Sequence, residues 1–226
     1  MNLLSGFHRA HRRLGLWILC VGFACSLSPA ALAGEHPEAV ATEKLVALLS
    51  GMTAMTADFH QYVEDARKSR LQDVTGKIRV KRPGKFRWDT NEPYPQSIIT
   101  NGDLLWIYDV DLEQVTEKKL DRQVGNTPAM LLSGNPKTIS ENFRISAFEY
   151  EETGEWRFDL TPNAEEALFE LLRVHFIDGR IRDMFLRDSL GQTTRIEFQN
   201  QTFNSVIEDS LFEFVPPEGI DVIRDM

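Results

Sequence analysis

The chain has 226 residues, of which 26% are charged and 42% hydrophobic, and its formal net charge is −9. Residues 1–33 hold three of the 25 basic residues and none of the 34 acidic ones, so residues 34–226 carry a formal charge of −12. So acidic a chain is repelled by nucleic acid and by anionic lipid, which argues against nucleic-acid binding and stable membrane insertion. The length after residue 33 suits one domain with a sizeable core.

The first 33 residues have the pattern of a secretory signal. Arg9, Arg12 and Arg13 precede an apolar run at 14–27, which is shorter than the ~20 residues that a membrane-spanning helix needs. Ala31-Leu32-Ala33 then supplies a small-x-small cleavage pattern. We expect residues 1–33 to be a cleaved signal peptide that leaves an unmodified N-terminus at Gly34, in preference to an uncleaved anchor or a twin-arginine signal.

Both cysteines, Cys20 and Cys25, lie inside this first segment, so residues 34–226 contain none. A lipoprotein signal needs a cysteine after a Leu-small-small run, and neither cysteine matches that pattern well. The domain therefore needs no disulfide even though export takes it into an oxidising compartment.

Helical spacing occurs in two places. Residues 38–50 are predicted to form a helix, because Leu45 and Leu49 recur near one face and Gly51 is a natural stop. Thr127-Pro128 then resembles an N-cap followed by proline at the first helical position, and the helix that it begins is apolar nearly all round. A helix so short and apolar must be covered, so we expect it to lie against the sheet as a plug or a lid. Shorter helical pieces are expected near 138–142 and 164–170.

The rest of the chain alternates apolar and polar residues, as at 57–64 and 74–81, and turn signals such as Asn101-Gly102 and Asp178-Gly179 separate the runs. This many short strands predict an antiparallel barrel or a strongly curved sheet. The other expected strands lie at about 96–100, 104–110, 112–119, 143–150, 155–160, 171–177, 180–187 and 193–199.

Signals for catalysis are absent from residues 34–226. The sequence has no Gly-x-Ser-x-Gly elbow, no phosphate-binding glycine loop and no His-Glu-x-x-His pair. His36, His60 and His175 are far apart and lack ligand spacing. We therefore expect no enzyme, no cofactor and no metal, although a secreted hydrolase stays open as an alternative. The apolar and aromatic faces of the strands suggest a packed core. Part of this apolar surface could remain accessible to an apolar ligand.

The run Lys81-Arg82-Pro83-Gly84-Lys85-Phe86-Arg87-Trp88 resembles a motif of the periplasmic outer-membrane lipoprotein carrier family, the LolA type. Further stretches agree with that family in order and spacing, and together they extend the resemblance over essentially all of residues 34–226. These stretches are Asp58–Gln61, Gly76–Val80, Asn101–Tyr108, Gly125–Leu132 and Phe212–Gly219.

The resemblance implies a mainly β domain at 34–226, an incomplete antiparallel β-barrel closed by a helical lid. Its cargo would be the acyl chains of lipoproteins, buried in an apolar cavity. An inner-membrane ABC-type lipoprotein-releasing complex would load this periplasmic monomer, and an outer-membrane lipoprotein receptor would unload it. A lipid-anchored receptor or a lipid-sensing domain of the same fold is the alternative.

The resemblance also assigns residues. Arg82 would lock the lid by hydrogen bonds to lid backbone near Leu49 and Leu132. The 163–172 region is more helical and acidic than the family pattern, which leaves the cavity rim open. The residues expected to line the cavity and lid are Leu45, Leu49, Phe86, Trp88, Trp106, Met130, Leu131 and Leu132.

Overall fold

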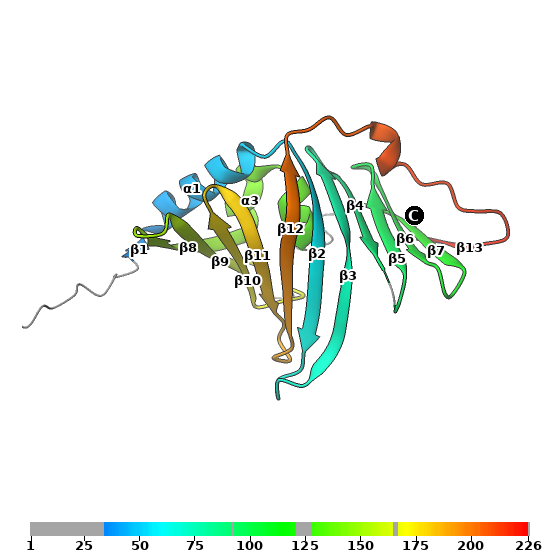
Figure 1. Cartoon of the computed structure of the whole chain (residues 1–226), viewed down its shortest axis with the longest axis horizontal. Helices are drawn as coiled ribbons and strands as arrows, with labels where there is room; N and C mark the ends of the chain where they lie inside the picture. The colour runs from blue at the N-terminus through cyan, green and yellow to red at the C-terminus, as the bar shows by residue number, and fades with distance from the viewer. Residues whose placement is uncertain (1–33, 92, 121–127, 165–166, 226) are drawn as a thin grey trace, which may run out of the picture. The chain divides into compact units, whose positions relative to one another are not determined.

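The computed structural model describes residues 34–225 except 92, 121–127 and 165–166, so the expected signal peptide lies outside the described residues. The described strands form one sheet in the order β1-β8-β9-β10-β11-β12-β2-β3-β4-β5-β6-β7-β13 (Figure 1). Their bounds are β1 (Gly34–His36), β2 (Ala54–Glu64), β3 (Arg70–Lys81), β4 (Lys85–Thr90), β5 (Gln96–Thr100), β6 (Leu104–Asp109), β7 (Gln114–Lys119), β8 (Phe143–Tyr150), β9 (Glu155–Pro162), β10 (Leu171–Ile177), β11 (Arg180–Arg187), β12 (Thr193–Phe203) and β13 (Asp221–Asp225).

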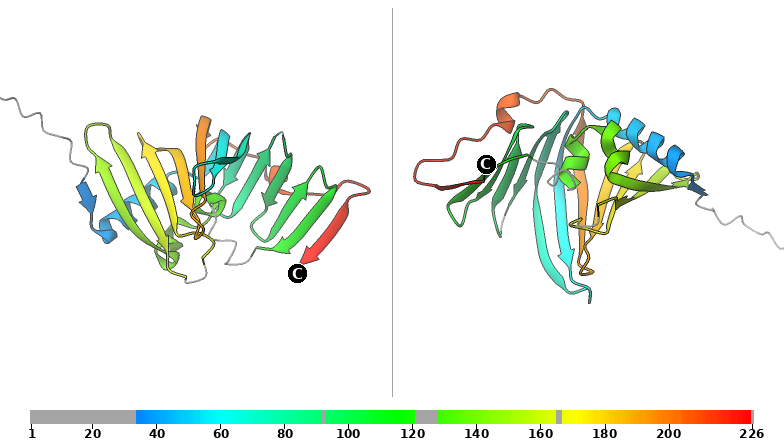
Figure 2. Two further views of the ribbon diagram at one scale, coloured as in Figure 1. Left: turned by 90° about the horizontal axis from the view of Figure 1, so that it is seen from below. Right: turned by 180° about the vertical axis from the view of Figure 1, so that it is seen from behind.

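The helices are short except for the first. They are α1 (Glu38–Ser50), α2 (Pro128–Ser133), α3 (Ile139–Asn142), and the 3-10 turns η2 (Pro136–Thr138) and η3 (Asp209–Phe212). Asn135 begins η2 by accepting a hydrogen bond from the backbone N–H of Lys137 at 3.1 Å. The blue helix α1 and the green helices of 128–142 lie on one face of the sheet, which we call the inner face (Figure 2).

The predicted fold class, a mainly β chain with a strongly curved open sheet and a few short helices, is confirmed. One pairing differs from the prediction, because β13 pairs with β7 in parallel while the other neighbours pair antiparallel. β7 begins at Gln114 and not at 112, because Glu113 turns the chain with a φ of 51°. The short strands β1, β4 and β13 were not predicted.

The helix expected near 164–170 is not present at its described residues 164 and 167–170, which form bends and irregular backbone. Phe169 accounts for this locally, because its buried side chain stacks on Phe143 with ring centroids 6.1 Å apart. A helix would turn successive side chains away from that contact. The helices expected at 38–50, from Pro128 onward and near 138–142 are present, as α1, α2 and α3. The expected N-cap, Thr127, lies outside the described residues.

Alternation sends successive side chains of a strand to opposite faces of the sheet. The inner face and its helices form the main core, which includes Phe59, Ile78 and Phe158. On the outer face of β5–β7, Ile99, Trp106 and Val115 form a separate cluster. The C-terminal segment covers that second cluster with partly buried residues that include Phe214, Ile220 and Val222.

Candidate functional site

The inner face of β2–β4 is an aromatic floor that depends on a glycine. The rings of Phe59 on β2 and Trp88 on β4 lie 4.4 Å apart, although β3 runs between the two strands. Gly76 on β3 allows this contact. A Cβ added there would come within 2.1 Å of the Asp89 carbonyl oxygen and 2.4 Å of the Phe59 ring. Any side chain at position 76 would therefore displace the ring or the neighbouring strand.

One helix covers this floor with leucines, and a second covers another part of the inner face. α2 contacts β3 and β4, and its Leu131 and Leu132 are buried in the same cluster as Phe86 and Trp88. α1 packs against β8 and η2, and its Leu45 and Leu49 are buried in that cluster too. In this closed arrangement the chain's own side chains fill the inner face. A guest molecule can reach the floor only if a covering helix moves, and α2 is the smaller candidate because it has only six residues.

Arg82 joins this cover to the sheet. β3 ends at Lys81, and Pro83, which has no N–H to offer a neighbouring strand, forces a turn before β4. The Arg82 guanidinium reaches one backbone carbonyl just after α1 and two at the C-terminal end of α2, one of them inside its last turn. Its Nε donates to Met52 O at 2.9 Å and its Nη2 donates to Leu131 O at 3.2 Å, while Nη1 donates to Gly134 O.

These bonds satisfy groups that α2 cannot satisfy itself. The last carbonyls of a helix lack partners within the helix, and they favour a nearby cation. α2 has no basic residue in its last turn, so Arg82 supplies that charge from the sheet. Burial lowers the pKa of Arg82 to about 10, because removal from water disfavours the charged form. The side chain therefore remains protonated at neutral pH.

The backbone of the same turn adds two further bonds. The N–H of Arg82 donates to Thr53 O at 2.8 Å, and the N–H of Gly84 donates to Ser133 O at 2.7 Å. Gly84 has a φ of +77°, a conformation that favours glycine. We call the turn Arg82–Gly84, together with its acceptors at the C-terminal ends of α1 and α2, the latch. The sequence analysis did not assign a role to Gly84 or Ser133. Ser133 could have been noticed, because it is a lone polar residue at the end of an otherwise apolar helix.

The structure brings most of the predicted residues together. Leu45, Leu49, Phe86, Trp88, Leu131 and Leu132 share the inner-face cluster. Trp106 does not join them. It belongs to the outer cluster, and its Nε1 donates to Glu117 at 2.9 Å. Leu105, the next residue on β6, faces the inner core in its place. The side chain of Met130 lies outside the described part of the structure.

The acceptors of Arg82 also differ from the expected ones in detail. The resemblance implied contacts near Leu49 and Leu132, and the bonds fall on Met52, Leu131 and Gly134. Each acceptor lies within three residues of the expected position. The guanidinium bonds carbonyls at the C-terminal ends of the two helices: Leu131 lies in the last turn of α2, and Met52 and Gly134 lie just past the helices.

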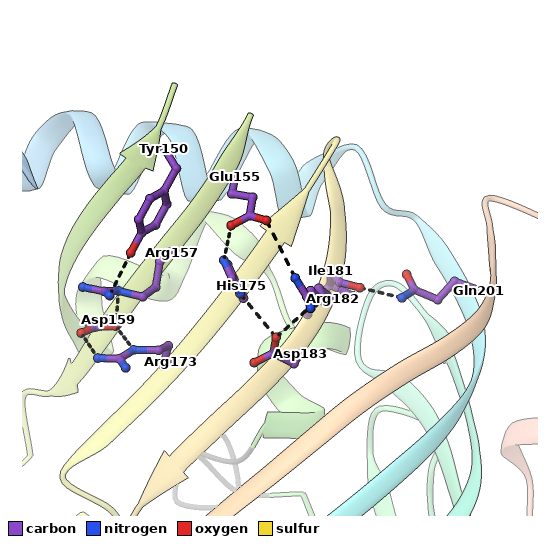
Figure 3. A network of polar contacts seen from close by, with 10 residues as sticks. All are labelled: Tyr150, Glu155, Arg157, Asp159, Arg173, His175, Ile181, Arg182, Asp183 and Gln201. Carbon is purple, nitrogen blue, oxygen red and sulfur yellow. Dashed lines mark hydrogen bonds and ion pairs between the residues drawn. The ribbon is translucent and has the colours of Figure 1, made fainter. Parts of the chain in front are cut away.

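The outer face of β8–β11 carries polar side chains, seen in Figure 3 with α1 behind the sheet. Arg173 bonds both oxygens of Asp159, at 2.6 and 2.7 Å, and these bonds raise the pKa of Arg173. His175 lies between Glu155 and Asp183 at 3.5 and 3.4 Å. These cross-strand pairs stiffen the sheet from outside.

Neither a metal site nor a membrane-spanning helix is seen in the described residues. Among the described residues, no group of three histidine, cysteine, aspartate or glutamate side chains is arranged to hold a metal ion. In the same part of the chain, we find no helix with both the length and the apolar character needed to cross a membrane.

An apolar inner face under a small latched helix is the construction of a protein that encloses an apolar ligand. The family model "Outer membrane lipoprotein carrier protein LolA" matches residues 50–215. The chain is 40% identical over 204 residues to an outer-membrane lipoprotein carrier protein of Pseudomonas aeruginosa, covering 90% of this chain and 97% of the relative. It is 39% identical over 209 residues to the carrier of Chromohalobacter salexigens, covering 92% and 97%. The chain therefore belongs to the outer-membrane lipoprotein carrier family.

Among solved structures, the chain is similar to a LolA superfamily protein of Nitrosomonas europaea. The TM-score is 0.44 at 8% identity, over 77% of this chain and 98% of that one. A likeness at this level carries no argument about function.

Proposed function

We propose that residues 34–226 form a periplasmic carrier that encloses the acyl chains of lipoproteins against the inner face of the sheet. One observation carries this proposal: a floor of Phe59, Phe86 and Trp88 is covered by a six-residue helix that a single arginine ties down. Membership of the lipoprotein carrier family supports it, and that family is one of carriers and not of enzymes.

The closed state gives the carrier a means of release. Each acyl methylene removed from water contributes ~0.8 kcal/mol, so a lipoprotein alone in water would not leave its membrane. A site with unlimited affinity would not deliver its cargo. Here Leu131 and Leu132 occupy the floor when α2 is closed, so cargo must displace them. Closing over the empty floor therefore competes with cargo and lowers its net affinity.

Loading and unloading would then be separate steps with separate partners. We propose that an inner-membrane ABC-type complex opens the latch and supplies cargo, since the sequence has no phosphate-binding glycine loop to use a nucleotide itself. An outer-membrane lipoprotein receptor would accept the cargo as α2 closes. Cleavage after Ala33 would free the carrier from the inner membrane.

Binding of an environment-sensitive apolar probe to the secreted protein tests this function. We expect the probe to bind and fatty acid to displace it, and Phe86→Asp to weaken both while far-UV circular dichroism stays unchanged. Phe185→Ser is the matched control, because Phe185 lies on the outer face beside Arg173 and Arg195. Absence of probe binding, or equal loss in both variants, would contradict the proposal.

Intact-mass measurement of the native protein separates the carrier from the lipid-anchored alternative. A carrier should begin at an unmodified Gly34. An acylated Cys25 at the N-terminus would instead assign the chain to the outer-membrane receptor.

A further inference from the structure

The end of the sheet away from the latch carries an unusual set of exposed side chains. In an antiparallel sheet alternate connections lie at the same end, so the β2–β3, β4–β5, β6–β7, β9–β10 and β11–β12 connections are together, opposite the Arg82–Gly84 turn (Figure 1). Exposed large apolar residues lie on or beside each of these connections. They are Leu71, Tyr94, Val110, Leu112, Leu168 and Leu190.

Two of these connections form one paired tip, residues 65–71 and 188–192, which we call the tip pair. β12 pairs with β2 up to Thr193 and Glu64, so the two hairpins end side by side. They also approach each other closely, because a Cβ added to Gly191 would lie 3.3 Å from the Cβ of Ala66.

An aspartate fixes each hairpin in the same way. Oδ1 of Asp65 accepts the backbone N–H groups of Arg67 and Ser69, both at 2.8 Å. Oδ1 of Asp188 accepts those of Leu190 and Gln192, at 2.9 and 2.8 Å. The tips are thus ordered turns, and both carboxylates point back into the chain that they hold.

The side chains that point outward have a different character. Leu190 is 84% exposed and Leu71 is 58% exposed, although neither turn requires an apolar residue there. Arg67 and Lys68, which come shortly before Leu71 in the sequence, are also exposed, and no ion pair within the described residues includes either one. The tip pair therefore presents exposed cationic and apolar side chains, although residues 34–226 as a whole carry a formal charge of −12.

We propose that the tip pair makes a transient contact with anionic phospholipid bilayers. Leu71 and Leu190 would enter the boundary between headgroups and acyl chains, while Arg67 and Lys68 face lipid phosphates. Charge complementarity favours this partner, since the local charge is opposite in sign to that of the chain. Two leucines are also too small an area for a stable protein interface. The net negative charge keeps the contact weak, and the latch at the other end stays free.

Labelled cysteines test this contact in the otherwise cysteine-free secreted protein. We would place an environment-sensitive fluorophore at Leu190→Cys or, as the matched control, at Val206→Cys, which is 93% exposed and follows β12 at the other end. Vesicles of phosphatidylethanolamine with phosphatidylglycerol at low salt should shift the emission of the first label only. Phosphatidylcholine vesicles should shift neither.

Vesicle flotation then gives affinities. Arg67→Glu and Lys68→Glu should each weaken binding about fivefold or more, the effect of one basic residue near an anionic surface. Leu71→Ser with Leu190→Ser should also weaken it, and Val206→Ser with Val215→Ser should not. The proposal does not depend on acyl binding by the inner face, and Phe86→Asp should float like the parent protein.

Four results would overturn the bilayer contact. The parent protein would fail to float at low salt, or both double-serine variants would lose binding equally. Loss confined to Phe86→Asp would place the lipid in the inner-face site. Cross-linking of position 190 to an envelope protein in place of lipid would assign the tip pair to a protein partner.

Discussion

The guanidinium of Arg82 donates a hydrogen bond to the carbonyl of Leu131 at 3.2 Å, and thereby joins the end of a strand to a helix 49 residues further along the chain. The same side chain reaches Met52 at 2.9 Å. One side chain therefore bonds the C-terminal ends of both covering helices, and we propose that it holds the small helix α2 on the inner face.

Removal of the guanidinium should separate loading from delivery. Arg82→Leu loses hydrogen bonds from a charged donor, which would destabilise the closed empty state by ~1–3 kcal/mol. Cargo would then lose its competitor, so the variant should accept lipoprotein from the inner membrane and release it poorly to the outer membrane. A two-step transfer assay that scores the steps separately measures this. Arg82→Lys keeps the charge without the planar fork and should be intermediate. Equal loss of both steps would indicate misfolding. Normal delivery would show that the hydrogen bonds of Arg82 to the helix ends play no part in transfer.

The floor should not tolerate a side chain at position 76. Gly76→Val would drive its Cβ into the Asp89 carbonyl and the Phe59 ring, and we expect a loss of about 2–4 kcal/mol in the free energy of unfolding. Gly51→Ala is the control, because its φ of −68° suits alanine and the nearest atom to the new Cβ is 3.5 Å away. Urea titration compares the two. Equal stability of Gly76→Val and the parent would show that the floor rearranges freely.

The two faces of β6 should respond differently to substitution. Trp106→Phe removes the hydrogen bond to Glu117 on the outer face, and we expect slightly lower stability with unchanged affinity for the apolar probe. Leu105→Ser changes the inner face and should lower the affinity for the apolar probe. Fluorescence titration of both variants gives the comparison. Weaker probe binding in Trp106→Phe alone would restore Trp106 to the ligand site.

Acidification should weaken the docking of η3 through protonation of one carboxylate, that of Asp209. Hydrogen bonds from Lys81 and Lys85 lower the pKa of Asp209 below 3.8. A lowered carboxyl pKa stabilises the folded form above the unfolded pKa, and that stabilisation is lost as pH falls through the lower, folded pKa. Docking of η3 should thus be constant from pH 7 to about pH 5 and weaken only below about pH 4.

Amide hydrogen exchange of residues 209–212 measures this loss of η3 docking. Asp209→Asn should show partly increased exchange at neutral pH and no further change attributable to this residue in acid. A transition in the parent near pH 6 would mean that another group holds η3.

Local pattern predicted much of this architecture, and what it missed depends on distant contacts. Alternation put Trp106 and Tyr108 on one face of their strand and Leu105 and Ile107 on the other. It could not say which face is inner, because that depends on the C-terminal segment covering Trp106. The parallel strand β13 was missed for the same reason, since its partner β7 lies about a hundred residues earlier in the chain.

The site shows the same division. Arg82 and Phe86 were identified from the run Lys81–Trp88, and the apolar character of α2 from its composition. The acceptors Met52 and Gly134 could not be identified, because they depend on where two helices end in space. The role of Gly76 likewise appears only when Phe59 and Trp88 meet across it.

The most direct test of the inner face as the acyl site is a photo-cross-linking experiment in cells. A benzophenone amino acid would replace Phe86 on the inner face or Phe185 on the outer face, and the purified protein would be analysed by mass spectrometry. Our account predicts lipoprotein adducts on acyl carbons at position 86 and none at position 185. Adducts at both positions, or only at position 185, would contradict it.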